Sequence, residues 1–297
     1  MKIFSIASLE RFSDIKAHTF RIWEHRYNFL IPNRTETNFR YYTIDDLNKL
    51  LNISLLNKYG YKISQLDKML PQDIEKKIAE LTGDDERKTK KINRLIITMF
   101  SADTEEFENI LDNSVLHWGI DVTIEEIILP FLDRVKLLSY NDQSSETHFT
   151  VTAIRRKIIL GIEKANPIKR INKSILFFLP EDEHFDLVLL YMNYVAKREG
   201  YKSLYLGTNI SMETLQNAAI EKSPDLLFTY LVPKHDLDID GLAQHLEQNL
   251  PNSILMLSGV TGKLLSTSIP ANVRLVNHRQ IKQLLLELSC KKILVHG

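Results

Sequence analysis

The chain is poor in several features, and each shortage excludes a class of protein. It has one cysteine, Cys290, in 297 residues, which excludes a disulfide scaffold and any metal cluster built from several thiolates. Its longest apolar runs fall far short of the ~18 residues that a membrane-spanning helix needs. The first residues include Glu10 and no long apolar core, so no secretory signal is expected. These absences predict a soluble, cytoplasmic protein of a reducing compartment.

Net charge is also lacking in the chain as a whole. Its 38 basic side chains equal its 38 acidic ones, which taken alone argues against a nucleic-acid partner. The balance is uneven, however: residues 1–70 hold 11 basic and 7 acidic side chains, a net charge of +4, while 71–170 carry −3 and 171–297 carry −1. Counterion release depends on the charges near the contact, so the basic N-terminal segment keeps phosphate binding open.

The first 70 residues combine short helical patterns with polar turns. Ser5 is a candidate N-cap of a helix that ends near Asp14, and a second helix is expected from about Lys16 to Arg26. After a turn-rich segment, Thr43 is expected to cap a third helix. Two short helices across a tight turn are typical of a helix-turn-helix, whose second helix enters the major groove of DNA.

The DNA contacts expected from this arrangement come from two places. The N-terminal residues of the second helix face the bases in such motifs, and a basic, aromatic hairpin beside that helix suits phosphate contact. The candidate DNA-binding residues are Lys16, His18, Thr19 and Arg21 on the helix and Arg34, Asn38, Arg40 and Tyr41 in the hairpin. Three further aromatic residues are expected in the core instead: Trp23, Tyr27 and Tyr42.

Residues 72–165 are predicted to be helical throughout. Apolar residues recur at helical spacing, as at Ile154, Ile158 and Ile162. Four long helices are expected, at 87–101, 103–117, 121–139 and 145–164. Helices of this length joined by short connections predict a four-helix bundle.

The pattern changes after Pro167, where apolar strand-like runs alternate with helical segments. Strands are expected at 174–179, 203–206, 226–232, 254–257 and 273–276, with helices at 182–198, 211–222, 238–249 and 278–289. Near-continuous apolar strands between helices predict a flavodoxin-like, doubly wound parallel sheet of five strands. The fold class is therefore multidomain α and α/β, and a ligand of the sheet would bind beyond the carboxyl ends of its strands.

Three stretches of the N-terminal segment closely resemble a known family. Over about residues 3–70, the sequence resembles the winged helix-turn-helix of MerR-type transcription regulators. The stretches that carry the resemblance are Phe4–Ile6, His18–Tyr27 and the pair Arg34–Thr35 with Asn38–Tyr42. Carried over residue by residue, the family's groove-helix and wing positions are Thr19, Arg21, Arg34, Arg40 and Tyr41. The resemblance also implies near-palindromic operator DNA as the partner, and with it a dimer or tetramer of the chain.

The rest of the chain resembles the CarA/CarH/LitR branch of this family over nearly its full length. That resemblance implies a winged helix-turn-helix at 1–71, a helical cap bundle at 72–167 and a cobalamin-binding-like, flavodoxin-like domain at 168–297. Asp182 and His184 match the branch's acid-x-His-x-x-Gly motif, in which the His ligates cobalt and the acid orients it. Leu187 replaces the glycine, and an added leucine in a close-packed channel costs about 1–3 kcal/mol.

The other cofactor positions are also changed in part. Thr229 and Leu231 stand for a Ser-x-Leu pattern, Ser258 and Gly259 for a Gly-Gly pair, and His148 for the histidine of a Glu-His pair in the cap. Leu137 stands where the cap of the branch has a tryptophan, and Thr147 stands at the glutamate. The structural alternatives are a solvated loop histidine for His184 and a partly buried helix histidine for His148.

Three functions remain open at this point. The first is a DNA-binding transcription regulator whose C-terminal region senses a ligand, with adenosylcobalamin as the candidate, or controls oligomerisation. The second is a cofactor-free regulator whose altered cobalamin domain serves assembly or binds a protein. The third, an enzyme component that uses cobalamin, is disfavoured by the DNA-reading head and by the lack of the roughly 250 residues that a catalytic barrel needs. We therefore expect a non-enzymatic, cytoplasmic homo-oligomer with no membrane partner.

Overall fold

The computed structural model describes residues 2–136, 145–167, 169–231, 239–259, 270–276 and 285. The chain divides into two compact units, Met1–Lys157 and Ile158–Gly297, and the boundary falls inside helix α9 (Ser145–Lys164). The division into three domains at residues 71 and 167 stays a prediction. Within the described residues, no helix has both the length and the apolar character needed to cross a membrane.

The first unit begins with a small helical head that carries a two-stranded wing. Its elements are α1 (Ile6–Ser13), α2 (Ala17–Arg26), β1 (Asn33–Arg34), β2 (Arg40–Tyr41), α3 (Ile44–Lys58), α4 (Ile63–Leu66) and α5 (Pro71–Glu80). Both predicted N-caps are confirmed: the Ser5 hydroxyl accepts from the Ser8 N–H at 3.2 Å, and Thr43 forms a capping box with Asp46. Each cap satisfies amide groups that the first helical turn leaves unpaired.

Aromatic side chains hold the head together. Phe20 and Trp23 bury one face of α2, and the Phe20 and Trp23 rings meet edge to face at 5.8 Å. Tyr42 is fully buried, whereas Tyr27 is half-buried and stacks on Phe29 at 6.0 Å. The expected core positions are thus confirmed for Trp23 and Tyr42, and Tyr27 lies at the edge of the core.

A helical bundle follows in the same unit. It comprises α6 (Asp84–Ser101), α7 (Thr104–Val122), a π-helical segment (Thr123–Ile128), α8 (Leu129–Val135) and α9. The break expected between the helices at 103–117 and 121–139 is confirmed, because the backbone is non-helical at Gly119. Residues 121–135 are helical without a gap, as the end of α7, the π-helix and α8, and residues 137–139 lie outside the described residues. Gly119 has φ 82° and kinks α7, and Pro130 has no N–H to continue a regular α-helical ladder.

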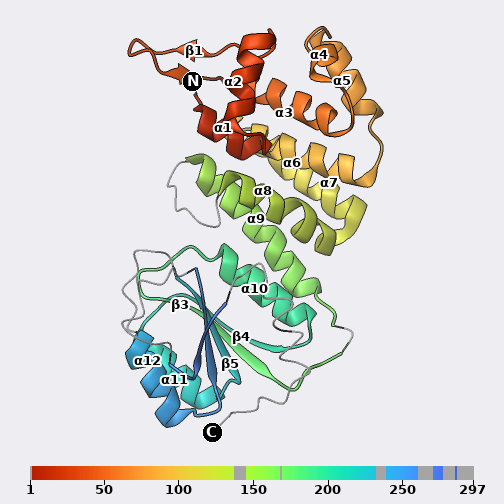
Figure 1. Cartoon of the computed structure of the whole chain (residues 1–297). Helices are drawn as coiled ribbons and strands as arrows, with labels where there is room; N and C mark the ends of the chain where they lie inside the picture. Colours follow the sequence, from red (N-terminus) through yellow and green to blue (C-terminus); the bar gives the residue numbers. More distant parts are fainter. Residues whose placement is uncertain are drawn as a thin grey trace. The chain divides into compact units, whose positions relative to one another are not determined.

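Head and bundle pack directly on each other. The Phe100 ring of α6 lies 4.9 Å from the ring of Phe4 and 5.0 Å from that of Phe12. The Asn93 amide donates to the Leu51 carbonyl at 3.3 Å, which joins α6 to α3. Figure 1 shows the head above α6 and α8, with the wing extending beside α2. The wing and α2 therefore belong to a head that packs against the helical bundle.

The second unit is an α/β domain. Its elements are β3 (Ser174–Pro180), α10 (Leu187–Arg198), β4 (Lys202–Ile210), α11 (Met212–Lys222), β5 (Leu226–Tyr230), α12 (Ile239–Asn249), β6 (Ile254–Ser258) and β7 (Val273–Leu275). The strands are parallel in the order β4-β3-β5-β6-β7, which confirms the flavodoxin-like sheet. The helix expected at 278–289 lies outside the described residues apart from Leu285, as does Cys290.

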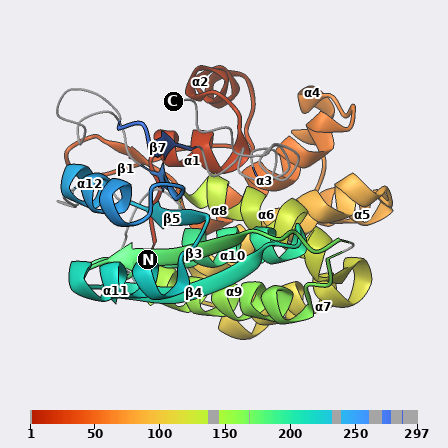
Figure 2. The ribbon, with the colours of Figure 1, turned by 90° about the horizontal axis from the view of Figure 1, so that it is seen from below.

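Helices cover both faces of this sheet. Leu176, Phe178 and Leu227 form a core with residues of α11 and α12, and these two helices lie side by side in Figures 1 and 2. α10 packs on the opposite face, where nine of its twelve residues are buried. Two covered faces explain why the strands are continuous apolar runs rather than alternating ones.

Candidate functional site

The exposed face of α2 carries the residues predicted to read DNA. His18 and Arg21 are exposed, while Phe20 and Trp23 point into the core. Thr19 is half-buried, so its side chain is less available for DNA contact than those of His18 and Arg21. A helix held by aromatics on one side and bearing polar donors on the other is suited to a groove.

The start of α2 is set by a residue that sequence reasoning missed. Lys16 is the N-cap, but its side chain makes no cap hydrogen bond. Instead, the Glu10 carboxylate of α1 accepts from the Ala17 N–H at 3.1 Å and pairs with the Lys16 ammonium at 3.4 Å. A carboxylate at a helix N-terminus is favoured by the helix dipole. The Lys16 side chain remains largely exposed.

The wing is a short antiparallel hairpin with a defined turn. Asn33 pairs with Tyr41 and Arg34 with Arg40. Asn38 has φ 66°, a conformation that asparagine tolerates better than most residues. Its amide oxygen accepts from the Arg34 guanidinium at 2.6 Å. This bond fixes the Arg34 side chain along the exposed edge of the wing.

Glu24 links the wing to α2, and sequence reasoning missed this residue too. Its side chain is 7% exposed, and it pairs with the Arg40 guanidinium at 3.5 Å and accepts from the Tyr42 hydroxyl. Burial and the Glu24 carboxylate raise the pKa of Tyr42 well above its ordinary value. Glu24, Arg40 and Tyr42 thus form a joint that orients the wing relative to α2. One sequence signal was available: an acid in an otherwise basic helix.

The loop after β3 holds the cofactor motif of the second unit. Asp182 has φ 64°, and its N–H donates to the Asn209 amide oxygen at 3.0 Å. The buried acid is Glu183, whose carboxylate accepts from the His184 and Phe185 N–H groups at 3.1 Å each. Asp182 and His184 are both exposed. The loop is therefore fixed by Glu183, and this ordered turn delays the start of the next helix to Leu187.

The space-making positions of this motif are filled by the protein itself. Leu187 is fully buried at the start of α10, and Tyr230 and Leu231 are buried at the end of β5. Gly259 has φ 83°, and a Cβ added there would lie 2.4 Å from the Leu231 carbonyl oxygen and 2.8 Å from the Tyr230 ring. The glycine thus allows close contact between the ends of β5 and β6.

Two buried hydroxyls lie near the carboxyl ends of the strands. Among the described residues, neither the Thr229 hydroxyl nor the Ser258 hydroxyl has a hydrogen-bond partner. Thr229 pairs with Leu257, and Tyr230 with Ser258. Successive strand residues point to opposite faces, so the two hydroxyls lie on opposite faces of the sheet. They do not line one common cavity.

The residues predicted for the cap site differ in exposure. His148 on α9 is exposed, and the neighbouring Thr147 is buried. The position of Leu137 lies outside the described residues. In the described part of the chain, no three His, Cys, Asp or Glu side chains gather as a metal site would require.

Comparison with known proteins finds relatives of the head and of most of the chain. Residues 4–73 match the model of the MerR HTH family regulatory proteins. The HTH-type transcriptional repressor CarH of Myxococcus xanthus is 26% identical over 250 residues, which cover 81% of this chain and 83% of CarH. CarA of the same organism, also an HTH-type transcriptional repressor, is 22% identical over 75% of this chain and 74% of CarA. The chain therefore carries a MerR-type helix-turn-helix head, and most of its length is similar to these two repressors.

Solved structures are similar to this chain at lower identity. A monomethylamine corrinoid protein of Methanosarcina barkeri covers 66% of this chain and 96% of its own length, with 14% identity and a TM-score of 0.46. A cobalamin-binding protein of Desulfitobacterium hafniense covers 66% of this chain and 97% of its own, with 12% identity and a TM-score of 0.35.

Proposed function

We propose that this MerR-type regulator binds duplex operator DNA through the exposed face of α2 and the edge of the wing. The observation that carries the proposal is the division of α2, in which Phe20 and Trp23 anchor the helix and leave His18 and Arg21 exposed. The wing edge adds the guanidinium of Arg34, fixed by Asn38. Lys16, Thr19 and Tyr41 would add contacts at the margin of this surface.

The basic residues divide into two roles in this proposal. Arg21 is on the face that enters the groove, where a guanidinium reads the O6 and N7 atoms of guanine. Arg34 and Arg40 lie on the wing, where they contact phosphates. Arg40 has a second role, because its pair with Glu24 orients the wing relative to α2.

Gel shifts with DNA selected from a random-sequence pool by the wild-type protein test this surface. Arg21→Ala, Arg34→Ala and Arg40→Ala should each weaken binding by about tenfold or more, since each removes a charged donor. Arg156→Ala is the control, because Arg156 is an exposed arginine on α9 that pairs with Glu108. Unchanged affinity in Arg21→Ala and Arg40→Ala together would reject the surface.

We also propose that the regulator works without bound cobalamin. CarH and CarA similarity makes a corrinoid sensor plausible, and His184 is the motif residue still exposed for ligation. The surrounding residues do not fit the group, however, because the fully buried Leu187 replaces the motif glycine and the Tyr230 ring packs against Gly259. The second unit would then serve assembly or bind a protein.

Absorbance spectroscopy tests the absence of cobalamin. The full-length protein is incubated with adenosylcobalamin in the dark, desalted and measured. We expect no corrinoid absorbance in the protein fraction. A stoichiometric corrinoid spectrum in the wild type that disappears in His184→Ala would overturn this part of the proposal and leave the DNA-binding surface untouched.

Two further parts of the proposal concern assembly and activity. A near-palindromic operator requires two copies of the head, so a dimer or tetramer is proposed as the DNA-bound form. Mass measurement of the DNA complex by light scattering would show the number of chains for each duplex, and a single chain would contradict the proposal. We propose a regulatory rather than an enzymatic role because CarH and CarA are repressors.

A further inference from the structure

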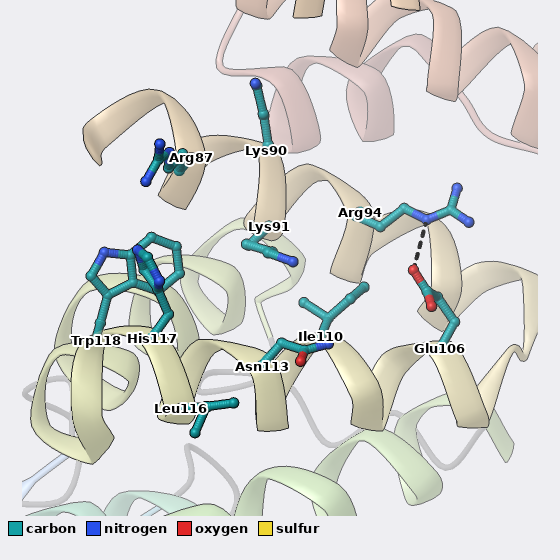
Figure 3. A pocket seen from close by; sticks show the side chains of 10 residues that line it. All are labelled: Arg87, Lys90, Lys91, Arg94, Glu106, Ile110, Asn113, Leu116, His117 and Trp118. Carbon is teal, nitrogen blue, oxygen red and sulfur yellow. Dashed lines mark ion pairs between the residues drawn. The ribbon is translucent and has the colours of Figure 1, made fainter. Parts of the chain in front are cut away.

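A groove between α6 and α7 is separate from the surface proposed for DNA. It has a volume of about 670 Å³, within the range of roughly 300–1,000 Å³ that is usual for small-molecule sites. Its two walls carry side chains from both helices (Figure 3), mainly Arg87, Lys90, Lys91 and Arg94 from α6 and His117 and Trp118 from α7. All of these residues belong to the first unit.

The charge of the groove is strongly one-sided. Four basic side chains and one acid, Glu106, line the groove, and Glu106 pairs with Arg94 at 3.6 Å. The Lys90 ammonium points away from α7 (Figure 3). Among the described residues, neither Arg87 nor Lys91 has an ion-pair partner. The nearby carboxylate of Asp84 is engaged elsewhere, since it pairs with Lys88 at 2.9 Å. The groove therefore holds cationic charge that the protein itself does not neutralise.

Lys90 lies in a partly buried position beside another cation. Its ammonium donates to the Leu81 carbonyl at 2.6 Å, which satisfies one of its three donors. Burial and the neighbouring Arg87 lower the pKa of Lys90 below its ordinary value, and the Glu86 carboxylate offsets part of this effect. Because the Lys90 ammonium is directed to Leu81, the groove cations that remain for a ligand are Arg87 and Lys91.

An ordered aromatic group closes one end of the groove. The Trp118 indole N–H donates to Asp84 at 2.7 Å, and its ring meets the His117 ring edge-on at 4.5 Å. The backbone leaves helical geometry at the next residue, Gly119, and the π-helix at Thr123–Ile128 follows. π-Helical segments are rare and occur often at functional sites. The kink ends the wall of the groove at Trp118.

We propose that this groove binds a small polyanion of nucleotide size, which carries two or more phosphate or carboxylate groups. The cations of α6 would hold the anionic groups, and Trp118 would contact the ligand's less polar part. The volume of the groove is that of a small-molecule site. This site lies outside the DNA surface and the cofactor motif, so it is independent of both.

Calorimetric titration of the full-length protein at low salt tests the site. Sodium pyrophosphate, adenosine triphosphate and citrate are the probes, with adenosine as the uncharged comparison. The variant is Arg87→Gln with Lys91→Gln, and the control is Lys68→Gln with Lys76→Gln, which removes two exposed cations from the head of the same unit. We expect saturable binding of pyrophosphate that weakens about tenfold or more in the variant and is unchanged in the control.

Thermal unfolding provides the second measurement. A ligand that binds the folded state raises its melting temperature, so pyrophosphate should raise that of the wild type and the control but not that of the variant. Binding of pyrophosphate without citrate would assign phosphate chemistry, and binding of both would assign polyanions generally. The proposal is overturned if no small anion binds saturably, or if the control weakens as much as the variant.

Discussion

At the scale of the single residue, Glu24 connects three parts of the head. Its buried carboxylate contacts Arg40 of the wing and Tyr42 beyond it, while its backbone belongs to α2. Glu24→Gln removes the charge and keeps the size. We expect the free energy of unfolding to fall by about 1.5–3 kcal/mol, the range for hydrogen bonds to a charged group. Urea unfolding measures this, with the exposed Glu36→Gln on the wing as control.

DNA affinity should fall in the same variant, although Glu24 is buried and makes no contact of its own. The wing would lose its fixed orientation, and with it the alignment of Arg34 and Arg40 beside α2. Equal stability and equal DNA affinity of Glu24→Gln and Glu36→Gln would contradict the role of the joint in orienting the wing.

Tyr42 gives the head a dependence on alkaline pH. Its pKa in the folded state is raised by burial and by Glu24, while a tyrosine in the unfolded chain titrates near pH 10. The folded state therefore retains a proton that the unfolded chain loses, so the stabilisation is complete below about pH 10 and is lost as pH rises through the folded pKa. The slope from this one group is at most about 1.4 kcal/mol per pH unit.

Tyr42→Phe isolates that contribution. The variant should be less stable than the wild type near pH 8, because Glu24 loses a donor. The difference should shrink as pH rises above 10, since only the wild type has the Tyr42 proton to lose. Urea unfolding at several pH values measures both chains under identical conditions. A difference that stayed constant with pH would contradict the assigned linkage.

At the scale of the element, the end of β6 is packed against the end of β5 through Gly259. Gly259→Ala would force a Cβ to 2.4 Å from the Leu231 carbonyl oxygen at a φ of 83°. Gly207→Ala is a matched control, because Gly207 also has a positive φ, 100°, but its added Cβ would lie 3.8 Å from the nearest atom, in the Tyr205 ring. Both variants carry the backbone strain, of order 1–3 kcal/mol.

Only Gly259→Ala adds the steric clash, so we expect it to lower the melting temperature of the sheet unit well beyond the effect of Gly207→Ala. Circular dichroism melting of the full chain measures both. Equal losses would mean that the space beside Gly259 is open, and would reopen this edge of the sheet as a cofactor site.

The elements that the sequence predicted well are those with one dominant signal. Five apolar runs predicted the five strands, and the caps at Ser5 and Thr43 predicted two helix starts. The misses arose where a tertiary contact decides the outcome. The helix expected from 182 starts at Leu187 because Glu183 and Asn209 fix the preceding turn, and no local pattern reveals a partner 26 residues away.

The candidate site was predictable to a similar degree. Exposure of His18 and Arg21 followed from the spacing of Phe20 and Trp23, since residues three apart share a helix face. The joint at Glu24 did not follow, because it depends on how the wing folds back onto α2. The groove of α6 and α7 was also missed, since its cations come together only when two helices pack.

At the scale of the whole molecule, averaged charge conceals where anions can bind. The neutral chain hides a head of +4, and the middle segment of −3 hides the cationic groove of α6. Local charge, not the sum, sets the field at a contact, because charges farther apart than about 8–10 Å are screened at physiological salt. The two basic regions should therefore respond to salt separately.

The salt dependence of DNA binding distinguishes the two kinds of arginine on the head. The logarithm of the association constant falls with the logarithm of salt concentration by about 0.9 for each phosphate neutralised on duplex DNA. Arg34→Ala should lower that slope by about 1 and weaken all sequences alike. Arg21→Ala should instead cost about 1–3 kcal/mol on the selected operator and reduce the preference for it over random DNA. Fluorescence anisotropy over a range of salt concentrations measures slope and preference together. An Arg21→Ala protein with intact preference would place that residue on the backbone, and the groove-facing role would then pass to His18.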